Sequence, residues 1–369
     1  MTVAAWKVML LAGPWSTADD AARVRGLVRR LASQGVEAEV VGVGPVAIDG
    51  MIACPGLARP WLRTLSARWL TADGARAPEL LHVLRADLDA AGLALAERWG
   101  VPYLVTVDEF LPTGGRLRLG RRLCRGIVAT GTDLADDLGR TLGVPRDSLT
   151  VIPPGIEPAE PATPEAGSGG ARVPVVGASG PLRDGSGLGT FLRAARIALD
   201  TGRDAEFVVA GRGREEAELR RLAGQLGVAD RVTFTGEADA AGPFWKVLDL
   251  FCQTATGPTS GRPLAMALAR GIPAIATDVP GLRPPALDAE PGLRVRPGDA
   301  DALAEAILAL LDDPDRARRL GMLARDWAAH LFDPDREAAD LAALYRRVLD
   351  AAAVGRLAVV CADAASRRS

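Results

Sequence analysis

Short apolar runs typical of β-strands alternate along this sequence with longer segments whose apolar residues recur at helical spacing. In residues 21–34, for example, Val24, Leu27 and Leu31 fall on one helical face, and Gly35 follows as a helix stop. Strands that alternate with helices run parallel, and the helices cover both faces of the sheet. The alternation therefore predicts an α/β fold built on doubly wound parallel sheets.

The alternation is interrupted once, at residues 156–171. This run, IEPAEPATPEAGSGGA, is rich in Pro, Gly, Ser and Ala and holds almost no core-forming residues, which is typical of a linker. A chain of 369 residues is also too long for one ordinary core. We therefore expect one domain at 1–155 and a second at 172–335, with 336–369 forming a helix that packs back on the first domain and a frayed tail. Two such domains would place a ligand cleft between the carboxyl ends of their strands.

The expected elements follow from the same periodicity. The predicted strands are residues 7–12, 37–43, 80–84, 103–107, 126–129, 149–153, 173–178, 206–210, 231–235, 248–253 and 273–277. The predicted helices are residues 21–34, 88–98, 133–142, 191–199, 215–226, 264–270, 301–311, 316–331 and 336–349.

Charge and composition exclude several classes of protein. The net charge of −2 gives no global field that would attract nucleic acid or a membrane. Four scattered cysteines and two histidines show no metal-binding spacing, so we expect no metal and buried free thiols in a reducing cytoplasm. The apolar run at residues 8–12 is too short for a secretory or membrane-spanning segment, which also favours a cytoplasmic protein.

Several segments in the second half resemble glycosyltransferase family 4, whose members are retaining enzymes that use nucleotide sugars. They are VIPPGIEP, FVVAGRGREEAELRRLAGQLGVADRVTFTGE, ALARGIPAIATDVPGL and GLRVRPGDADALAEAILALLDDPDRARRLGMLAR, and they follow one another in the family's order over residues 151–350. In the first half, LVRRLASQGVEAEVVG and ELLHVLRADLDAAGLALAERWGVPYLVTVDE are similar to the family more weakly. The resemblance implies the GT-B architecture, in which two Rossmann-like domains face a central cleft, with the acceptor on the first domain and the nucleotide-sugar donor on the second.

The charged residues that the family uses to hold its donor are replaced in this sequence. Where the family has an Arg and a Lys that grip the diphosphate, this chain has Pro181 and Ser186. Where it has two glutamates eight residues apart, this chain has Pro258 and Met266, and a third glutamate position falls on Pro284. Neither Pro nor Met can accept the hydrogen bonds that a carboxylate accepts from sugar hydroxyls. No Glu or Lys occurs from residue 251 to residue 289, so a small alignment slip would not restore the pair.

The first half departs from the family in a similar way. The paired glycines of its first loop fall on Ala18 and Asp19, and its His-Asp pair falls on Asp108 and Glu109. Only His82 stands at a familiar histidine position. We therefore take His82, Asp108 and Glu109 as candidate catalytic residues. The alternatives are a partly buried histidine at a strand end and two solvated loop carboxylates.

Other residues could replace the lost donor-binding cations. A helix N-terminus with free amides attracts anions, and flexible cationic turns can hold a diphosphate. The candidate donor- or nucleotide-binding residues are Arg183, Gly211, Arg212, Gly213, Gly261 and Arg262. The alternative is that the arginines are simply exposed residues in an arginine-rich sequence. A further group, Arg116, Arg118, Arg121, Arg122 and Arg125, alternates with leucines and could touch an anionic membrane; a solvated helix or loop is favoured.

These replacements lead to two hypotheses of function. Losing one preorganised transition-state donor costs about 3–4 kcal/mol, and losing several could erase most of an enzymatic rate enhancement. The favoured hypothesis is a weak or non-catalytic GT-B protein that acts as a binding or regulatory subunit, with a protein partner. The alternative is a divergent glycosyltransferase that moves a hexose from a nucleotide sugar to a glycan, a lipid or a small molecule. A sugar-nucleotide epimerase is less favoured because the required carboxylates and histidines are missing, and no cofactor other than the donor itself is implied.

Overall fold

The computed structural model describes residues 6–15, 18–44, 48, 50–70, 77–112, 115–120, 122–157, 172–236, 242–283 and 293–353. The chain divides into two compact units. Unit 1 comprises Met1–Gly155 and Asp333–Ser369, and unit 2 comprises Ile156–Phe332. The expected linker lies outside the described residues except for residues 156 and 157, and the expected tail lies outside them as well. No helix among the described residues is both long and apolar enough to cross a lipid bilayer.

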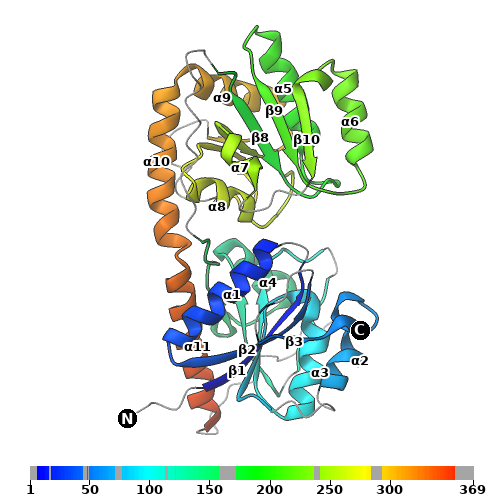
Figure 1. The fold of residues 1–369 in the computed structure, drawn as a ribbon, viewed down its shortest axis with the longest axis vertical. Coiled ribbons are helices and arrows are strands. Elements are labelled where there is room, and N and C mark those ends of the chain that lie inside the picture. Colours follow the sequence, from blue (N-terminus) through cyan, green and yellow to red (C-terminus); the bar gives the residue numbers. More distant parts are fainter. Residues whose placement is uncertain are drawn as a thin grey trace. The chain divides into compact units, whose positions relative to one another are not determined.

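The described part of unit 1 contains one parallel sheet in the order β3-β2-β1-β4-β5-β6-β7. Figure 1 labels its strands β1, β2 and β3. Its strands are β1 (Trp6–Pro14), β2 (Val36–Val43), β3 (Ile52–Ala53), β4 (Leu80–Val83), β5 (Tyr103–Val107), β6 (Cys124–Ala129) and β7 (Leu149–Val151). The strand order reverses between β1 and β4, because the chain builds β2 and β3 on one side of β1 and the remaining strands on the other. In such sheets ligands bind at the carboxyl ends of the strands beside this switch point.

Helices cover both faces of the unit 1 sheet, as alternation along its strands requires. The helices are α1 (Ala18–Ser33), α2 (Arg63–Leu70), α3 (Asp89–Trp99), α4 (Thr132–Leu142) and α11 (Pro334–Ala353). Val8 and Leu10 of β1 belong to a buried cluster with residues of α1 and α11. Met9 and Leu11, which point to the opposite face, pack in a second cluster with residues of α3 and α4. Helix α11 therefore belongs to the first unit although it ends the described chain.

The described part of unit 2 contains a parallel sheet in the order β10-β9-β8-β11-β12-β13. Its strands are β8 (Val175–Ser179), β9 (Glu206–Ala210), β10 (Val232–Gly236), β11 (Leu250–Gln253), β12 (Ala274–Thr277) and β13 (Arg294–Val295). Its helices are α5 (Leu188–Asp200), α6 (Glu216–Gln225), α7 (Pro243–Val247), α8 (Arg262–Ala269), α9 (Ala300–Asp312) and α10 (Pro314–Leu331). The strand order reverses between β8 and β11, so this sheet has its own switch point.

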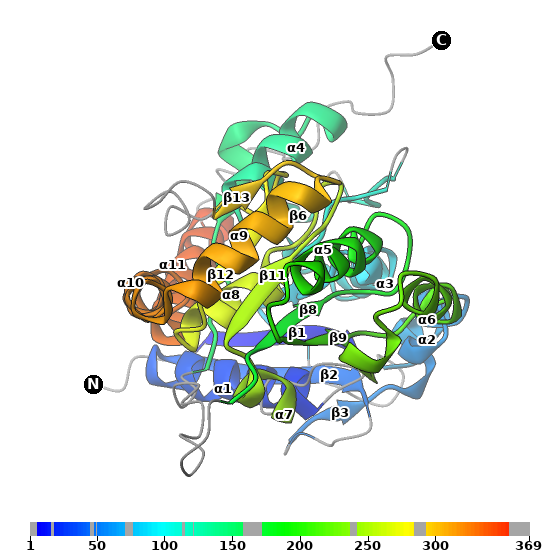
Figure 2. The ribbon, with the colours of Figure 1, turned by 90° about the horizontal axis from the view of Figure 1, so that it is seen from above.

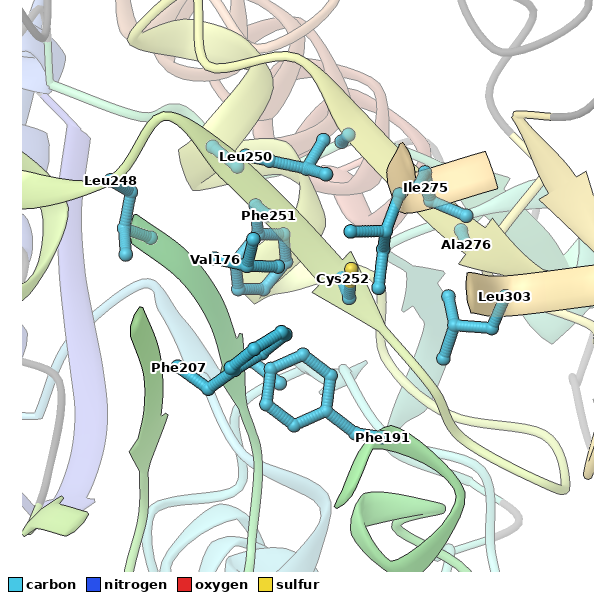
Figure 3. Close-up of a cluster of buried hydrophobic side chains, with 14 of the residues drawn as sticks. Val176, Phe191, Phe207, Leu248, Leu250, Phe251, Cys252, Ile275, Ala276 and Leu303 are labelled. Carbon is cyan, nitrogen blue, oxygen red and sulfur yellow. The ribbon is translucent and has the colours of Figure 1, made fainter. Parts of the chain in front are cut away.

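One hydrophobic cluster holds unit 2 together. Helices α5 and α9 lie side by side over the sheet (Figure 2). The close-up in Figure 3 shows Phe191 of α5 beside Phe207 of β9, whose ring centroids are 5.7 Å apart. Cys252 of β11 lies in the same apolar group and is fully buried. Of the described residues, Cys54, Cys124 and Cys252 are free and buried thiols.

The sequence missed four short elements. Strands β3 and β13 have two residues each, and α7 has five, so none is long enough to show a period. Helix α2 was also missed. The predicted strand at residues 248–253 begins later, at Leu250. Leu248 instead packs where a side chain on Gly177 would stand, since a Cβ there would lie 2.5 Å from the Leu248 Cδ2.

Candidate functional site

Two loops at the carboxyl edge of the unit 2 sheet are joined through their backbones. The loop after β8 accepts and donates hydrogen bonds with the loop after β9, including Leu182 N to Arg212 O at 2.9 Å and Gly180 N to Ala210 O at 3.0 Å. Gly211 has a φ of 151°, and a Cβ there would lie 1.9 Å from the Gly180 carbonyl oxygen. Only glycine therefore allows the two loops to approach this closely.

The joined loops present exposed guanidinium groups. Arg183, Arg212 and Arg214 are all exposed. Of the neighbouring acids, Asp184 accepts a hydrogen bond from the next backbone amide, and Glu216 pairs with Arg220 of its own helix. Among the described residues no carboxylate forms an ion pair with Arg183 or Arg212. The edge therefore carries cations that an anionic ligand could reach.

The loop that leads into α8 joins the same group. Thr256 N donates to Gly185 O at 2.9 Å, and the Thr254 hydroxyl donates to Ser186 O at 3.2 Å. Gly261 precedes the first helical residue, Arg262, whose side chain is exposed. The structure thus places Arg183, Gly211, Arg212, Gly213 and Gly261 on loops at one edge of one sheet, and Arg262 at the start of α8 at the same edge.

The positions that the sequence analysis aligns with charged residues of the family differ in their surroundings. Pro181 and Pro258 are exposed, and Ser186 is half-buried. Met266 is only 7% exposed and belongs to the apolar cluster of unit 2. Pro284 lies outside the described residues. Met266, which the sequence analysis aligns with a family glutamate, is therefore a core side chain.

Two buried polar atoms flank the switch point of unit 2. Ser179 ends β8 and Gln253 ends β11, and the two strands are neighbours in the sheet. The Ser179 Oγ and the Gln253 Oε1 are buried and have no hydrogen-bond partner in the described structure. Buried polar atoms without a partner are uncommon and call for a water or a ligand. Sequence inspection missed both residues because each is an ordinary strand-end residue.

His82 of unit 1 lies in the protein interior with both ring nitrogens engaged. Its Nδ1 lies 2.6 Å from the Tyr345 hydroxyl of α11, and its Nε2 lies 2.8 Å from the Thr106 hydroxyl of β5. The side chain is fully buried, and this burial lowers the pKa of His82 to about 3. The imidazole is therefore neutral at ordinary pH, with one nitrogen donating and the other accepting.

Asp108 and Glu109 follow β5 at the carboxyl edge of the same sheet. Burial raises the pKa of Asp108, while the charges of Arg85 and Arg23 act on it through space in the opposite sense. Glu109 is exposed. Sequence inspection did not single out Arg85 or Arg23, whose charges act on Asp108 through space.

Arg85 and Arg23 are each held by a carboxylate. Arg85 Nε lies 3.1 Å from Asp87 Oδ1, and its Nη1 donates to Pro14 O at 3.4 Å, across the switch point. Arg23 Nη2 lies 3.1 Å from Glu337 Oε1. Asp87 is two residues from Arg85, whereas Pro14 and Glu337 come from distant parts of the chain and leave no local sequence signal.

Glu337 and its surroundings close one side of this edge. Glu337 is only 7% exposed, and its Oε2 accepts a hydrogen bond from Gly155 N at 2.8 Å. A cavity of about 20 Å³ lies beside it. Its lining residues are Arg23, Val24, Leu27, His82, Leu84, Thr106, Val128, Thr130, Ile152, Glu337 and Leu341. This volume suits about one water molecule, not a sugar ring.

The arginine-rich segment of unit 1 is a loop over its described residues 115–120, 122 and 123, and Arg125 lies within β6. Arg116, Arg118 and Arg122 are exposed, whereas the intervening leucines pack against the second cluster. The Asp89 carboxylate accepts a hydrogen bond from the Arg118 amide and fixes the loop. Arg121 lies outside the described residues. Within the part of the chain that the structure describes, no group of three His, Cys, Asp or Glu side chains is placed to hold a metal ion.

Two doubly wound α/β units of this kind define the GT-B architecture. A solved structure that shares it is that of the Anabaena protein HepE in complex with UDP and glucose, with a TM-score of 0.72 and 16% identity over 92% of this chain and 99% of that one. Residues 173–313 match the model of "Glycosyl transferases group 1", and residues 21–160 match that of "Glycosyltransferase Family 4".

Curated relatives agree with these matches. The 2-deoxystreptamine glucosyltransferase of Streptomyces kanamyceticus is 28% identical over 70% of this chain and 74% of its own length. The D-inositol 3-phosphate glycosyltransferase of Xylanimonas cellulosilytica is 30% identical over 69% of this chain and 68% of its own length. The chain belongs to glycosyltransferase family 4.

Proposed function

We propose that this chain is a weak or non-catalytic member of glycosyltransferase family 4 that acts as a binding or regulatory subunit. The observation that carries the proposal is the burial of Met266 in the apolar cluster of unit 2, at the position of a family glutamate. A carboxylate there would lose its hydration in the core and would depend on pairing with the buried Arg270, whose guanidinium donates to the Met266 carbonyl oxygen. The Met266 side chain offers a donor sugar no such acceptor. The cytoplasm is the proposed location, in keeping with the free buried thiols.

The state of His82 supports the same proposal. A general acid or base needs a proton-transfer group within reach of the substrate and a pKa near the working pH. The imidazole of His82 is fully buried, and its pKa is lowered to about 3. We infer that His82 anchors α11 to the sheet through Tyr345, and that it takes no part in proton transfer.

Binding of a nucleoside diphosphate to unit 2 remains part of the proposal. Arg183, Arg212 and Arg214 lie on loops whose backbones are joined, so their charges are held in one region. The unpartnered atoms of Ser179 and Gln253 lie beside the switch point, where ligands of such sheets bind. A protein with these features can retain a nucleotide while lacking the groups that speed transfer.

A second candidate is a divergent active glycosyltransferase that moves a hexose to a glycan, a lipid or a small molecule. The relatives favour it, because proteins named as glucosyl- or glycosyltransferases match about 70% of this chain. In that case Arg183, Arg212 and Arg262 would stabilise the leaving diphosphate. Asp108 would be the carboxylate available on the acceptor side.

Thermal denaturation with UDP, GDP and their sugars, together with a transfer and hydrolysis assay, separates the two. The proposal expects a clear stabilisation by a nucleotide, about 2.7 kcal/mol at a ligand concentration 100 times Kd. It also expects turnover far below about 1 s⁻¹, the low end of ordinary enzymes. Turnover within the ordinary range would establish the second candidate instead. Absence of any nucleotide effect would remove the nucleotide-binding part of the proposal.

A further inference from the structure

Helix α10 packs on unit 2 through one of its sides. Leu320, Gly321 and Ala324 are buried on that side. A Cβ on Gly321 would lie 2.0 Å from the Gly271 carbonyl oxygen, so the helix backbone lies directly against the turn that follows α8. In Figures 1 and 2, α10 forms the border of unit 2, and the other labelled elements of that unit lie on one side of it. Within this unit, the opposite side of α10 is therefore open.

The open side of α10 carries two large apolar side chains. Met322 is 56% exposed and Leu323 is 59% exposed, and the two are adjacent in the sequence. Arg319 lies about one turn before them and Asp326 about one turn after them, and both are exposed. An exposed apolar patch that is rimmed by charged side chains is typical of a surface that another protein covers.

The exposed residues of this side follow an order that is complementary to its own reverse. Residues three or four positions apart lie on the same side of a helix. With this spacing, the exposed residues form what we call the α10 stripe: Asp315, Arg319, Met322, Leu323, Asp326 and His330. An acid and a base precede the apolar pair, and an acid and a base follow it. Within the described part of the chain, Asp315 pairs with Arg318 at 2.6 Å, whereas Arg319 and Asp326 form no ion pair.

This charge order selects a second copy of the chain as the partner. When two α10 helices pack antiparallel about a two-fold axis between Met322 and Leu323, Arg319 of each copy faces Asp326 of the other. The acid and the base at the two ends of the stripe are matched in the same way, and the apolar pairs meet at the axis. A parallel arrangement would instead place Arg319 on Arg319 and Asp326 on Asp326, which is unfavourable. An anionic membrane fits the stripe less well, because its two carboxylates would face the lipid headgroups.

We propose that the α10 stripe is the interface of a two-fold symmetric homodimer in which the two α10 helices run antiparallel. In such a dimer the same patch serves both copies, so the patch must be complementary to itself. The stripe is about 22 Å long at about 1.5 Å per residue, and one helix face of that length covers less than the roughly 800 Å² per partner of a standard interface. We therefore expect a reversible dimer with a Kd on the order of 10 µM. Such a dimer requires neither nucleotide binding nor sugar transfer, so it stands independently of the proposed function.

Sedimentation velocity of the full chain over about 1–200 µM tests for the dimer. We expect the measured mass to rise with concentration from 38.5 kDa toward twice that value. A monomer throughout this range would overturn the proposal. The double variant Met322→Ser with Leu323→Ser removes the apolar centre and should raise the Kd about 10-fold or more. Leu65→Ser, at an exposed leucine of α2, is the matched control and should leave the Kd unchanged.

Charge reversal tests the antiparallel pairing itself. Arg319→Asp sets acid against acid across the axis, and Asp326→Arg sets base against base, so each variant alone should raise the Kd about 10-fold or more. An equimolar mixture of the two variants restores both opposite-charge pairs in a heterodimer, which should form about as tightly as the wild-type dimer. The two positions are seven residues apart, beyond the reach of a pair within one helix, so such a rescue reports contact between copies. Glu305→Arg, at an exposed residue of α9, is the matched charge-reversal control.

Each result of these measurements decides the proposal. Formation of the heterodimer from two variants that are monomeric alone supports the antiparallel α10 interface. A mixture that stays monomeric overturns the pairing, and an unchanged Kd in Arg319→Asp, with its fold checked by circular dichroism, overturns the assignment of the surface. If a charge variant fails to fold, the serine double variant still decides. The nucleotide-induced stabilisation is expected to be the same in all of these variants, so failure of the proposed function leaves the dimer test intact.

Discussion

Lowering the pH from 7 to 5 should destabilise unit 1 through His82. The unfolded imidazole has a pKa near 6.5, whereas burial lowers the folded value to about 3. Between these values the unfolded chain binds the proton that the folded protein excludes, so the free energy of unfolding falls as the pH falls. Each pH unit in this window costs about 1.4 kcal/mol. At pH 5, about 1.5 units below the unfolded pKa, the cost is about 2 kcal/mol; above pH 7 the contribution is fully present.

Urea unfolding followed by circular dichroism at pH 7, 6 and 5 measures this effect. Burial raises the pKa of Asp108 and Asp89, which favours the folded state as the pH falls and so opposes the histidine. The comparison must therefore be made with His82→Gln, which cannot titrate and whose amide can still reach the hydroxyls of Tyr345 and Thr106. We expect the wild type to lose about 2 kcal/mol more than the variant between pH 7 and pH 5. Equal losses would show that His82 is not sealed as the structure indicates.

Three further outcomes follow from the contacts at the two edges. Glu337→Ala should lower the free energy of unfolding in urea by about 2–4 kcal/mol, since it removes the partner of Arg23 and of the buried Gly155 amide. Glu337→Gln keeps an acceptor for that amide and should lower it by less. Equal losses in the two variants would contradict this account. Gly211→Ala should destabilise unit 2 by more than about 1 kcal/mol, because its Cβ would lie 1.9 Å from the Gly180 carbonyl oxygen. Gly224 of α6 has no atom within contact of such a Cβ, so Gly224→Ala should stabilise the unit by about 0.5–1 kcal/mol. Similar thermal midpoints for the two variants would refute the close packing at Gly211. Arg212→Ala should weaken UDP or GDP binding about 10-fold or more in titration calorimetry, and undiminished binding would place the diphosphate elsewhere.

Local patterns in the sequence were sufficient for most of the fold. Strand β5 (Tyr103–Val107) and strand β9 (Glu206–Ala210) have the predicted bounds, because each is a continuous apolar run between clear stops. Strands β3 and β13 were missed because two paired residues leave no period to detect. The loop glycines were singled out as flexible, yet the structure uses Gly211 for a close backbone approach.

The contacts that define the edge of unit 1 had no local signal. His82 and Tyr345 are 263 residues apart, and Arg23 and Glu337 are 314 apart. A single sequence can suggest that His82 occupies a histidine position of the family, but it does not show whether the side chain faces a ligand or the interior. In this structure α11, from the far end of the described chain, packs over His82 through Tyr345. Only the three-dimensional structure could distinguish these cases.

The unit 2 positions that the sequence aligns with family donor-binding residues differ in how readily they could carry a charged group. At the unit 2 edge, Pro181 and Ser186 lie on an open loop, so a cation at either position could be held without disturbing the core. Met266, in contrast, is one of a continuous run of buried residues in α8, from Leu264 to Leu268. A glutamate there would be buried in the apolar cluster, at a desolvation cost of several kcal/mol unless a cation paired with it. The buried guanidinium of Arg270, which donates to the Met266 carbonyl oxygen, is the cation that such a glutamate would have to pair with. A cation at either loop position therefore needs no change in the core, whereas a glutamate at residue 266 depends on pairing inside it.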